Sequence, residues 1–263
     1  KDESGRLNMR AVKLYIDGAM GSRGAALLAD YSDDAGNGGL LFMPVEDLET
    51  KVDKAMACGF QVGIHAIGDR GNRVTLDALE SSMQRFPDNP GRHRVEHAQT
   101  LTDTDLPRFS ELAIIAAMQP THATSDMYWV EERLGPERVI YAYAWRSLLD
   151  SGARLALGSD FPVEQVNPML GIHAAVTRQD TKGWPPGGWY PQEALSREEA
   201  VRGFTLDAAY SGFMEKSVGS LESGKRADFI VLDQNIFEIE AAEIAGVKVL
   251  QTWLDGELVY SYP

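Results

Sequence analysis

Residues 60–98 read FQVGIHAIGDRGNRVTLDALESSMQRFPDNPGRHRVEHA, and this stretch decides the fold class. Phe60 to His65 is a short apolar run that predicts a buried strand. Asn72 to Phe86 carries apolar residues at helical spacing, and Asp69 is expected to cap that helix. Two prolines then break the chain before His93 to Ala98, which predicts a second strand. This order predicts two parallel strands joined by a right-handed crossover.

The same alternation extends to both sides of this stretch. Further strands are expected over Ala11 to Gly18, Ala113 to Gln119 and Arg154 to Gly158, and further helices over Val45 to Ala57, Thr102 to Leu112, Pro136 to Asp150 and Met169 to Arg178. Five repeats favour a parallel sheet, and both a doubly wound sheet and an eight-stranded barrel give this pattern. No strand is followed by a Gly-x-Gly-x-x-Gly fingerprint, which disfavours a nucleotide-binding α/β protein.

The chain changes character near its C-terminus. Ser196 to Gly212 predicts a helix with Ser196 as its cap. Ser223 to Asp233 and Gly246 to Tyr260 are rich in alternating apolar residues. The second of these segments contains Asp255-Gly256 between two apolar runs, a strong signal for a β-hairpin. We therefore expect a small antiparallel β module at the end of the chain.

The charge and cysteine content exclude several classes of protein. The chain has 263 residues, with 25 Lys and Arg against 39 Asp and Glu, so its formal net charge is −14. Such an acidic chain has no general attraction for nucleic acid or for an anionic membrane surface, so neither partner is expected. Cys58 is the single cysteine, so no intramolecular disulfide can form; we expect it to be buried, and the protein to be cytoplasmic.

Four polar side chains of metal-binding type lie on the predicted parallel strands. His65 and His97 end two neighbouring strands, Asp160 directly follows another, and Lys13 lies within the first. Parallel-sheet enzymes keep their sites at the carboxyl ends of strands. Imidazole and carboxylate are suitable ligands for zinc and similar ions, whereas a lysine ammonium would repel a metal. Carboxylation by carbon dioxide would convert Lys13 into an anionic carbamate that can bridge two ions.

Five motifs together carry a resemblance to a known family. They are VKLYIDG (12–18), HAIGDRGN (65–72), RVEHAQ (94–99), GSDFPV (158–163) and VGSLESGKRADFIVLD (218–233). This set resembles the amidohydrolase superfamily, and most closely its amidohydrolase-3, or YtcJ-like, group, which includes N-substituted formamide deformylases. The resemblance covers the chain from about Ala11 to Tyr260.

The resemblance implies a fold and a ligand set. The fold would be an α/β, TIM-type (β/α)8 barrel with a composite β-sandwich. Lys13, as a carbamate on the fourth barrel strand, would bridge the metals, with His65 and His97 as ligands from strands five and six. Asp160 would be the strand-eight ligand and the proton shuttle. His122 and Arg23 are expected to contact the substrate.

The sequence also departs from the family pattern. The His-x-His pair of the first barrel strand is absent, and five βα units cannot close an eight-stranded barrel. We therefore expect the C-terminal portion of a longer protein, with residues 1–216 forming barrel strands four to eight and residues 217–263 forming half of the sandwich. An open barrel edge would favour association with another chain.

The function expected from these observations is metal-dependent hydrolysis of an amide-like C–N bond in a small molecule. The cofactor would be one or two divalent ions, with zinc favoured and iron or manganese open. An ester or a cyclic amide are related alternatives for the bond that is cleaved. A different alternative is an incomplete amidohydrolase that serves as an assembly piece without metal.

Overall fold

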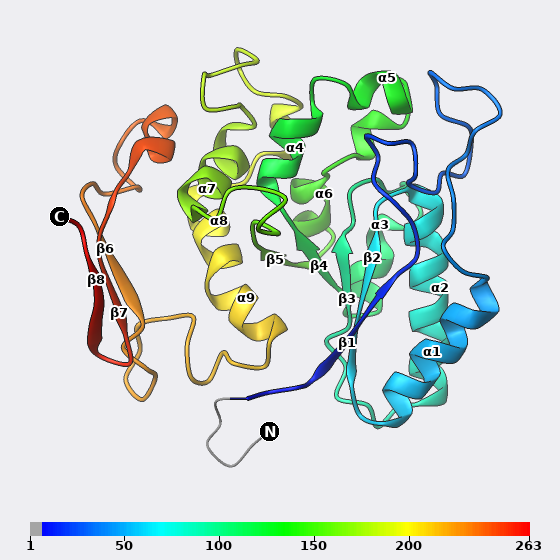
Figure 1. Ribbon diagram of the computed structural model, residues 1–263, viewed down its shortest axis with the longest axis horizontal. Coiled ribbons are helices and arrows are strands. Elements are labelled where there is room, and N and C mark those ends of the chain that lie inside the picture. The colour runs from blue at the N-terminus through cyan, green and yellow to red at the C-terminus, as the bar shows by residue number, and fades with distance from the viewer. Residues whose placement is uncertain (1–6) are drawn as a thin grey trace. The chain divides into compact units, whose positions relative to one another are not determined.

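The computed structural model describes residues 7–263, and its central feature is a five-stranded sheet (Figure 1). Strands run in the order β1-β2-β3-β4-β5, and the pairs from β1 to β4 are parallel. Because sequence order equals spatial order, each connection steps to the next strand, as the alternating pattern predicts. The strands are β1 (Ala11–Tyr15), β2 (Gln61–Ala66), β3 (Arg94–His97), β4 (Ile115–Met118) and β5 (Arg154–Leu157). A parallel α/β fold is thereby confirmed, while its assignment to barrel strands four to eight stays a prediction.

The chain divides into two compact units that are interleaved in sequence. The first contains residues up to 117, 129–144 and 150–154, and the second contains residues 118–128, 145–149 and 155–263. Helices of the first unit are α1 (Val45–Ala57), α2 (Asp69–Arg85), α3 (Leu106–Glu111), α5 (Val130–Leu134) and the 3-10 turn η1 (Val139–Tyr141).

Helices α1 and α2 pack on each other and on β2 (Figure 1). Their apolar faces bury Leu48 and Leu76 completely, and Ile64 of β2 is also fully buried. Burial of an aliphatic side chain of this size contributes about 1.5–3 kcal/mol. Five of the six residues of β2 are buried, so this strand lacks the in–out alternation of a sheet with one wet face.

The second unit combines helices with a separate antiparallel sheet. Its helices are α4 (Pro120–Asp126), α6 (Trp145–Asp150), α7 (Pro168–Thr177), η2 (Pro191–Glu193), α8 (Arg197–Phe204), α9 (Leu206–Ser211) and η3 (Ala241–Gly246). The sheet has the order β6-β7-β8, with β6 (Phe229–Leu232), β7 (Val249–Leu254) and β8 (Glu257–Ser261). This sheet lies within the predicted 217–263 segment, although the division at 216/217 itself stays a prediction.

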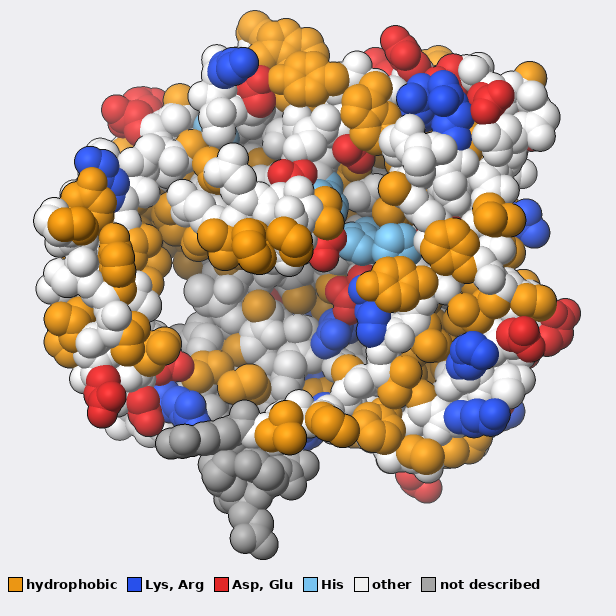
Figure 2. All heavy atoms as spheres, in the orientation of Figure 1, with side chains coloured by type: hydrophobic (Ala, Val, Ile, Leu, Met, Phe, Trp, Pro, Cys, Tyr) orange, Lys and Arg blue, Asp and Glu red, His pale blue; other side chains and the backbone are white. Residues whose placement is uncertain are grey.

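The predicted hairpin at the end of the chain is confirmed. Asp255 and Gly256 join β7 to β8, and both have positive φ, 52° and 80°. Positive φ at both central residues is the signature of the type I′ turn, whose twist matches the flanking strands. Several apolar side chains of β8 stay exposed, Leu258 and Val259 among them. Figure 2 shows hydrophobic side chains over much of the surface of the molecule.

Two of the expected helices are interrupted. Pro136 to Asp150 was expected to be one helix, but it forms η1 and α6 with an extended segment between them. The Tyr143 N–H donates to the Gln99 carbonyl at 2.7 Å, and Ala142 bridges Thr100. These long-range backbone hydrogen bonds replace the helical hydrogen bonds that a continuous helix would form here.

None of the helices within residues 7–263 is both long and apolar enough to span a bilayer.

The helix expected over Ser196 to Gly212 breaks at Thr205. The backbone of Thr205 has φ −121° and ψ −87°, outside the helical region, and separates α8 from α9. Its hydroxyl donates to the Val201 carbonyl at 2.7 Å. Such local side-chain bonds offer the backbone an alternative to a continuous helix.

Two single-residue expectations are also corrected. Asp69 lies inside the first turn of α2 rather than at its cap, because Gly68 takes the cap position. The Asp69 carboxylate instead accepts a hydrogen bond from the Leu28 N–H at 2.8 Å and so fastens the loop before α1. Cys58 is exposed rather than buried, because α1 ends there in a surface turn through Gly59.

Candidate functional site

The two predicted histidine ligands lie side by side in the first unit. His65 is near the end of β2, His97 ends β3, and these strands are parallel neighbours. Their ring centroids are 4.5 Å apart, with the planes edge-on at 71°. Both rings are largely shielded from solvent: the His65 side chain is 13% exposed, and His97 is 6% exposed. The structure therefore brings the two imidazoles together at the carboxyl edge of the sheet.

A left-handed backbone accounts for the position of the His97 ring. In the strand register His97 is the partner of Ala66, whose side chain points to the opposite face from that of His65. Regular alternation would thus direct the two imidazoles apart. Instead His97 and Ala98 have φ of 79° and 44°, which turns the end of the strand. Non-glycine residues adopt this conformation at a cost, and such strain clusters at functional sites.

Lys13 lies on the same face of the sheet as His65. The register places Lys13 beside Gly63 and Tyr15 beside His65. The Lys13 Nζ lies 4.5 Å from the centroid of the Tyr15 ring, and that ring is centred 5.0 Å from the His65 ring. Lys13, Tyr15 and the two histidines thus form one continuous row across three strands.

Asp17 is a buried carboxylate behind His65 that the sequence reasoning missed. It is fully buried, and its Oδ1 lies 3.7 Å from the His65 Nε2. It accepts hydrogen bonds from the N–H groups of Ile67, Gly68 and Ala26 at 2.8–2.9 Å. Burial raises the Asp17 pKa to about 6, against the lowering effect of these three bonds. Asp17 lies two residues beyond β1, in the Ile16-Asp17-Gly18 segment of the first motif. This position just after a strand could have identified it from the sequence.

The space beneath His65 is filled by a charged network. Gly63 lies two residues before His65 and on the same face of β2. A Cβ on Gly63 would lie 2.8 Å from the Glu96 Oε1. Glu96 forms an ion pair with Arg94 at 2.8 Å, and Arg94 also donates to the Gln61 side-chain oxygen at 2.9 Å. Gly63 therefore makes room for the Arg94–Glu96 pair.

Asp160 and His122 belong to the second unit. Asp160 follows β5 in an exposed turn with φ 56°, and its carbonyl accepts a hydrogen bond from the Val163 N–H at 2.9 Å. His122 is a buried residue of α4, with 8% of its surface exposed. Their membership in a site with His65 and His97 stays a prediction.

Arg23 belongs to the first unit and is engaged by carboxylates of its own loop. Its guanidinium meets Asp33 at 2.8 Å and Asp34 at 3.8 Å. Arg23 holds the pKa of Asp33 below its usual range through this hydrogen-bonded contact. The expected contact of Arg23 with substrate stays a prediction, and such a contact would compete with these ion pairs.

The donor set of the first unit fits part of a metal site. Two imidazoles at the end of adjacent strands are nitrogen ligands of the kind zinc takes, and a catalytic zinc usually has three protein ligands. Within residues 7–263 no group of three or more His, Cys, Asp or Glu side chains is placed to hold an ion. Lys13 could add an oxygen donor only as a carbamate, because its ammonium repels a cation.

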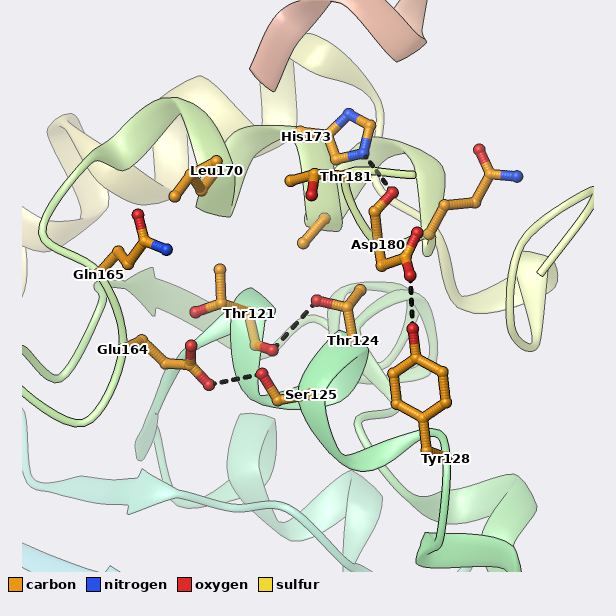
Figure 3. Close-up of a pocket in the computed structure, with 12 residues that line it drawn as sticks. Thr121, Thr124, Ser125, Tyr128, Glu164, Gln165, Leu170, His173, Asp180 and Thr181 are labelled. Carbon is orange, nitrogen blue, oxygen red and sulfur yellow. Dashed lines mark hydrogen bonds between the residues drawn. The ribbon is translucent and has the colours of Figure 1, made fainter. Parts of the chain in front are cut away.

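The second unit contains a small cavity of about 250 Å³ (Figure 3). Helix α4 forms one wall and α7 the other, and two loops close the ends. Its lining residues carry mainly hydroxyl, amide and carboxylate groups: Thr121, Thr124, Ser125, Tyr128, Glu164, Gln165, Leu170, His173, Ala174, Gln179, Asp180 and Thr181. Motif reasoning identified none of this lining as a site.

Comparison with known proteins settles the family. The sequence pattern described as "Amidohydrolase family" matches residues 2–260. This chain is a member of the amidohydrolase family. The resemblance to the YtcJ-like group is also confirmed, because the chain is 36% identical over 251 residues to a Bacillus subtilis protein named "Putative amidohydrolase YtcJ".

Other relatives of this chain are similar over the same region. The chain is 39% identical to the LONG AFTER FAR-RED 3 protein of Arabidopsis thaliana, over 97% of this chain and 43% of that protein. It is 29% identical to the N-substituted formamide deformylase of Arthrobacter pascens, over 98% of this chain and 47% of that enzyme. A crystal structure of an uncharacterized metal-dependent hydrolase from Pyrococcus horikoshii superposes with a TM-score of 0.80 at 34% identity, covering 90% of this chain and 47% of the other.

The amidohydrolase chain spans less than half the length of these relatives. The YtcJ match covers 95% of this chain and 47% of YtcJ, and the other coverages are similar. The match to these relatives therefore shows the family, and the activity of a whole protein stays a proposal.

Proposed function

We propose that this amidohydrolase chain contributes to metal-dependent hydrolysis of an amide-like C–N bond other than a peptide bond. One observation carries the proposal: His65 and His97 meet edge-on at 4.5 Å at the carboxyl ends of adjacent parallel strands. A relative named N-substituted formamide deformylase and a solved structure named metal-dependent hydrolase support the same chemistry. The proposed substrate is a small neutral amide, in keeping with a chain of net charge −14 that would repel anionic polymers.

In this proposal the protein positions a metal and moves one proton. His65 and His97 would hold the ion through ring nitrogens, with Lys13 as a carbamate and Asp160 as further oxygen donors. A divalent ion acidifies water and polarises a carbonyl. The Asp160 carboxylate would accept the proton released by the attacking water and deliver it to the leaving nitrogen, which yields a carboxylate and an amine. Positioned proton transfer of this kind is worth about 10²–10⁴ in rate.

The donors narrow the choice of ion to a few metals. Imidazole nitrogens with oxygen donors suit zinc, and they also suit iron and manganese. We propose zinc, with one or two ions per chain.

A second candidate function is an assembly piece that binds no metal. No group of three or more His, Cys, Asp or Glu side chains in residues 7–263 is placed to hold an ion, and the chain covers less than half of its relatives. In that case the strand-end histidines would be relics of the family pattern.

Metal binding separates the two candidates. We would strip the full chain with a chelator, add zinc, cobalt, iron or manganese, and measure stoichiometry by elemental analysis and affinity by calorimetry. The hydrolase proposal expects about one ion or more per chain, and at least ~10-fold weaker binding after His65→Ala or His97→Ala, since each loses one ligand. All variants would carry Cys58→Ala, which removes the exposed thiol as an adventitious ligand.

The same variants would be assayed for amine release from N-alkylformamides, with matched esters for comparison. Hydrolysis that depends on the added metal and is lost with His97→Ala supports the proposal. A chain that retains no metal, and whose histidine variants behave as wild type, is the assembly piece.

A further inference from the structure

Negatively charged side chains line the cavity between α4 and α7. Among the residues that the structure describes, two carboxylates line it, those of Glu164 and Asp180, and no Lys or Arg side chain does. The remaining polar groups are neutral hydroxyls and amides together with His173. Leu170 and Ala174 of α7 add apolar side chains to the lining. A ligand that matches this lining carries a positive charge and a small apolar body.

Hydrogen bonds brace both ends of the cavity. At one end the Ser125 hydroxyl donates to the Glu164 Oε1 at 2.8 Å. At the other end the Tyr128 hydroxyl donates to the Asp180 carboxylate, and the Tyr128 ring stacks on Trp184 with centroids 4.9 Å apart. The backbone N–H of Trp184 also donates to Asp180, at 2.9 Å. The two carboxylates are therefore held in place across the cavity before any ligand arrives.

The Glu164 end retains unused hydrogen-bonding capacity. The Ser125 bond is the only one the Glu164 carboxylate makes among residues 7–263. The Thr121 Oγ1 is buried without a hydrogen-bond partner in the same part of the chain, and in Figure 3 it points toward Glu164 and Gln165. Leaving a buried hydroxyl without a hydrogen-bond partner is unfavourable. A ligand that donates hydrogen bonds here would remove this cost.

By contrast, the Asp180 end is already satisfied. The Asp180 carboxylate accepts from Tyr128 and from the N–H groups of Lys182 and Trp184. It therefore supplies negative charge across the cavity rather than a free acceptor. The ammonium position is thus expected at Glu164.

We propose that this cavity is a binding site for a compact organic cation, namely a primary ammonium on a short alkyl chain. The ammonium would donate to the Glu164 carboxylate, the Thr121 hydroxyl and the Gln165 side-chain oxygen, and the alkyl chain would lie on Leu170 and Ala174. About 250 Å³ is below the range of pockets that hold drug-sized ligands, so the ligand is small. This site goes beyond the proposed function, because it requires neither a metal nor bond cleavage.

Alternative ligands fit the lining less well. An anion would face two carboxylates with no basic side chain to compensate. A bare metal ion lacks a ligand cluster, since no group of three or more metal-binding side chains occurs in residues 7–263. A neutral alcohol could bond Thr121 but would forgo the charge-assisted bond to Glu164, which is roughly twice as strong as a neutral one.

The test is direct binding by the full chain, in EDTA so that metal chemistry does not contribute. The probes are n-butylammonium, n-butanol and butyrate. Their binding is measured by calorimetry and by protein NMR at low salt. We expect the ammonium alone to bind, with shifts at the Thr121 and Ser125 resonances. Glu164→Gln should weaken binding about tenfold and Thr121→Val a few-fold, because each removes one partner of the ammonium.

The matched control is Glu137→Gln, the same substitution at an exposed position of the first unit. Because the chain is acidic overall, this control measures general attraction for cations, and it should bind like wild type. Equal weakening by Glu164→Gln and Glu137→Gln, equal binding of butanol, or wild-type shifts away from the cavity would each overturn the proposal. The NMR readout uses the wild-type protein, so it decides the question even if Glu164→Gln does not fold.

Discussion

At the scale of single residues, buried polar groups fix the chain around the candidate site. The Asp17 carboxylate ties three backbone N–H groups from two separate loops, those of Ala26, Ile67 and Gly68. A Cβ on Gly71 would lie 2.5 Å from the Asp17 Oδ2, so position 71 in the first turn of α2 has no room for a side chain. Asp17 therefore shapes the chain that immediately follows His65.

Replacing Asp17 by alanine should lower the free energy of unfolding by about 3 kcal/mol. The substitution leaves three buried N–H groups without their acceptor, and an unsatisfied buried donor costs about 1–3 kcal/mol. Urea denaturation would measure the loss. Asp88→Ala, at an exposed position, is the control and should change stability by less than about 0.5 kcal/mol. A loss for Asp17→Ala no larger than the control would contradict this role.

His93 makes stability depend on pH in a defined direction. Its Nδ1 accepts a hydrogen bond from the Val62 N–H at 3.1 Å, and burial lowers the His93 pKa from 6.5 to about 4. Between these two pH values the unfolded chain binds the proton and the folded chain does not. The free energy of unfolding is therefore unaffected by His93 protonation above pH 6.5. As the pH falls from 6.5 toward 4, it decreases by about 3 kcal/mol in total.

His93→Asn would keep an acceptor near Nδ1 without a titrating ring. We expect the difference in unfolding free energy between pH 7.5 and pH 4.5 to be smaller in this variant than in wild type. Urea titrations of both proteins at the two pH values give the comparison. Parallel pH profiles would show that the His93 pKa does not differ between the folded and unfolded chains, which would contradict the prediction.

At the scale of elements, the ends of strands and helices carry most of the specific geometry. The last residue of β3, His97, and the residue after it, Ala98, are left-handed and bring the His97 ring to His65, while α8 begins in a complete capping box. The Ser196 hydroxyl accepts from the Glu199 N–H, and the Glu199 carboxylate accepts from the Ser196 N–H at 2.7 Å. Arg146 on α6 forms an ion pair with the same Glu199 carboxylate, and the Arg146 hydrogen bond keeps the pKa of Glu199 low. The cap thus also connects two helices of the second unit.

Ser196→Ala should cost about 1 kcal/mol of stability, because one N–H of the first turn of α8 loses its acceptor. Ser196→Asp restores an acceptor at the same position and should recover most of the loss. Thermal or urea denaturation of the three proteins tests this prediction. Equal losses for the two variants would mean that packing of the serine, not capping, is responsible.

At the scale of the whole molecule, charge dominates behaviour in solution. The chain carries a formal charge of −14, and its sequence pI is about 4.8. Repulsion between copies keeps an acidic protein soluble at neutral pH and vanishes at the pI. The exposed apolar residues of the C-terminal sheet, such as Leu254 and Tyr260, would then meet little electrostatic opposition to contact.

Solubility should accordingly reach its minimum near pH 4.8. Light scattering between pH 4 and pH 8 would follow this, with recovery on return to pH 7.5 to separate association from unfolding. Substituting Leu258 by lysine on exposed β8 should reduce the scattering, since it removes apolar surface and shifts the pI upward. Scattering that increases steadily below pH 4 without a minimum in solubility near 4.8 would show acid unfolding instead.

The sequence by itself determined the parallel alternation of strands and helices, the terminal hairpin and the placement of His65 and His97 at strand ends. These features follow from hydrophobic periodicity and turn chemistry, which act between residues close in the chain. The family followed from five motifs read together, and the roles of Lys13 and Asp160 stay predictions.

Only the tertiary structure decided how distant segments constrain one another. The pairing of Tyr143 with Gln99 broke an expected helix, and the contact between Asp17 and His65 joined residues 48 positions apart. The left-handed end of β3 reversed the side on which regular alternation would place the His97 ring. In each case a long-range contact or a turn outweighs the local preference, because its free energy depends on partners that periodicity does not encode.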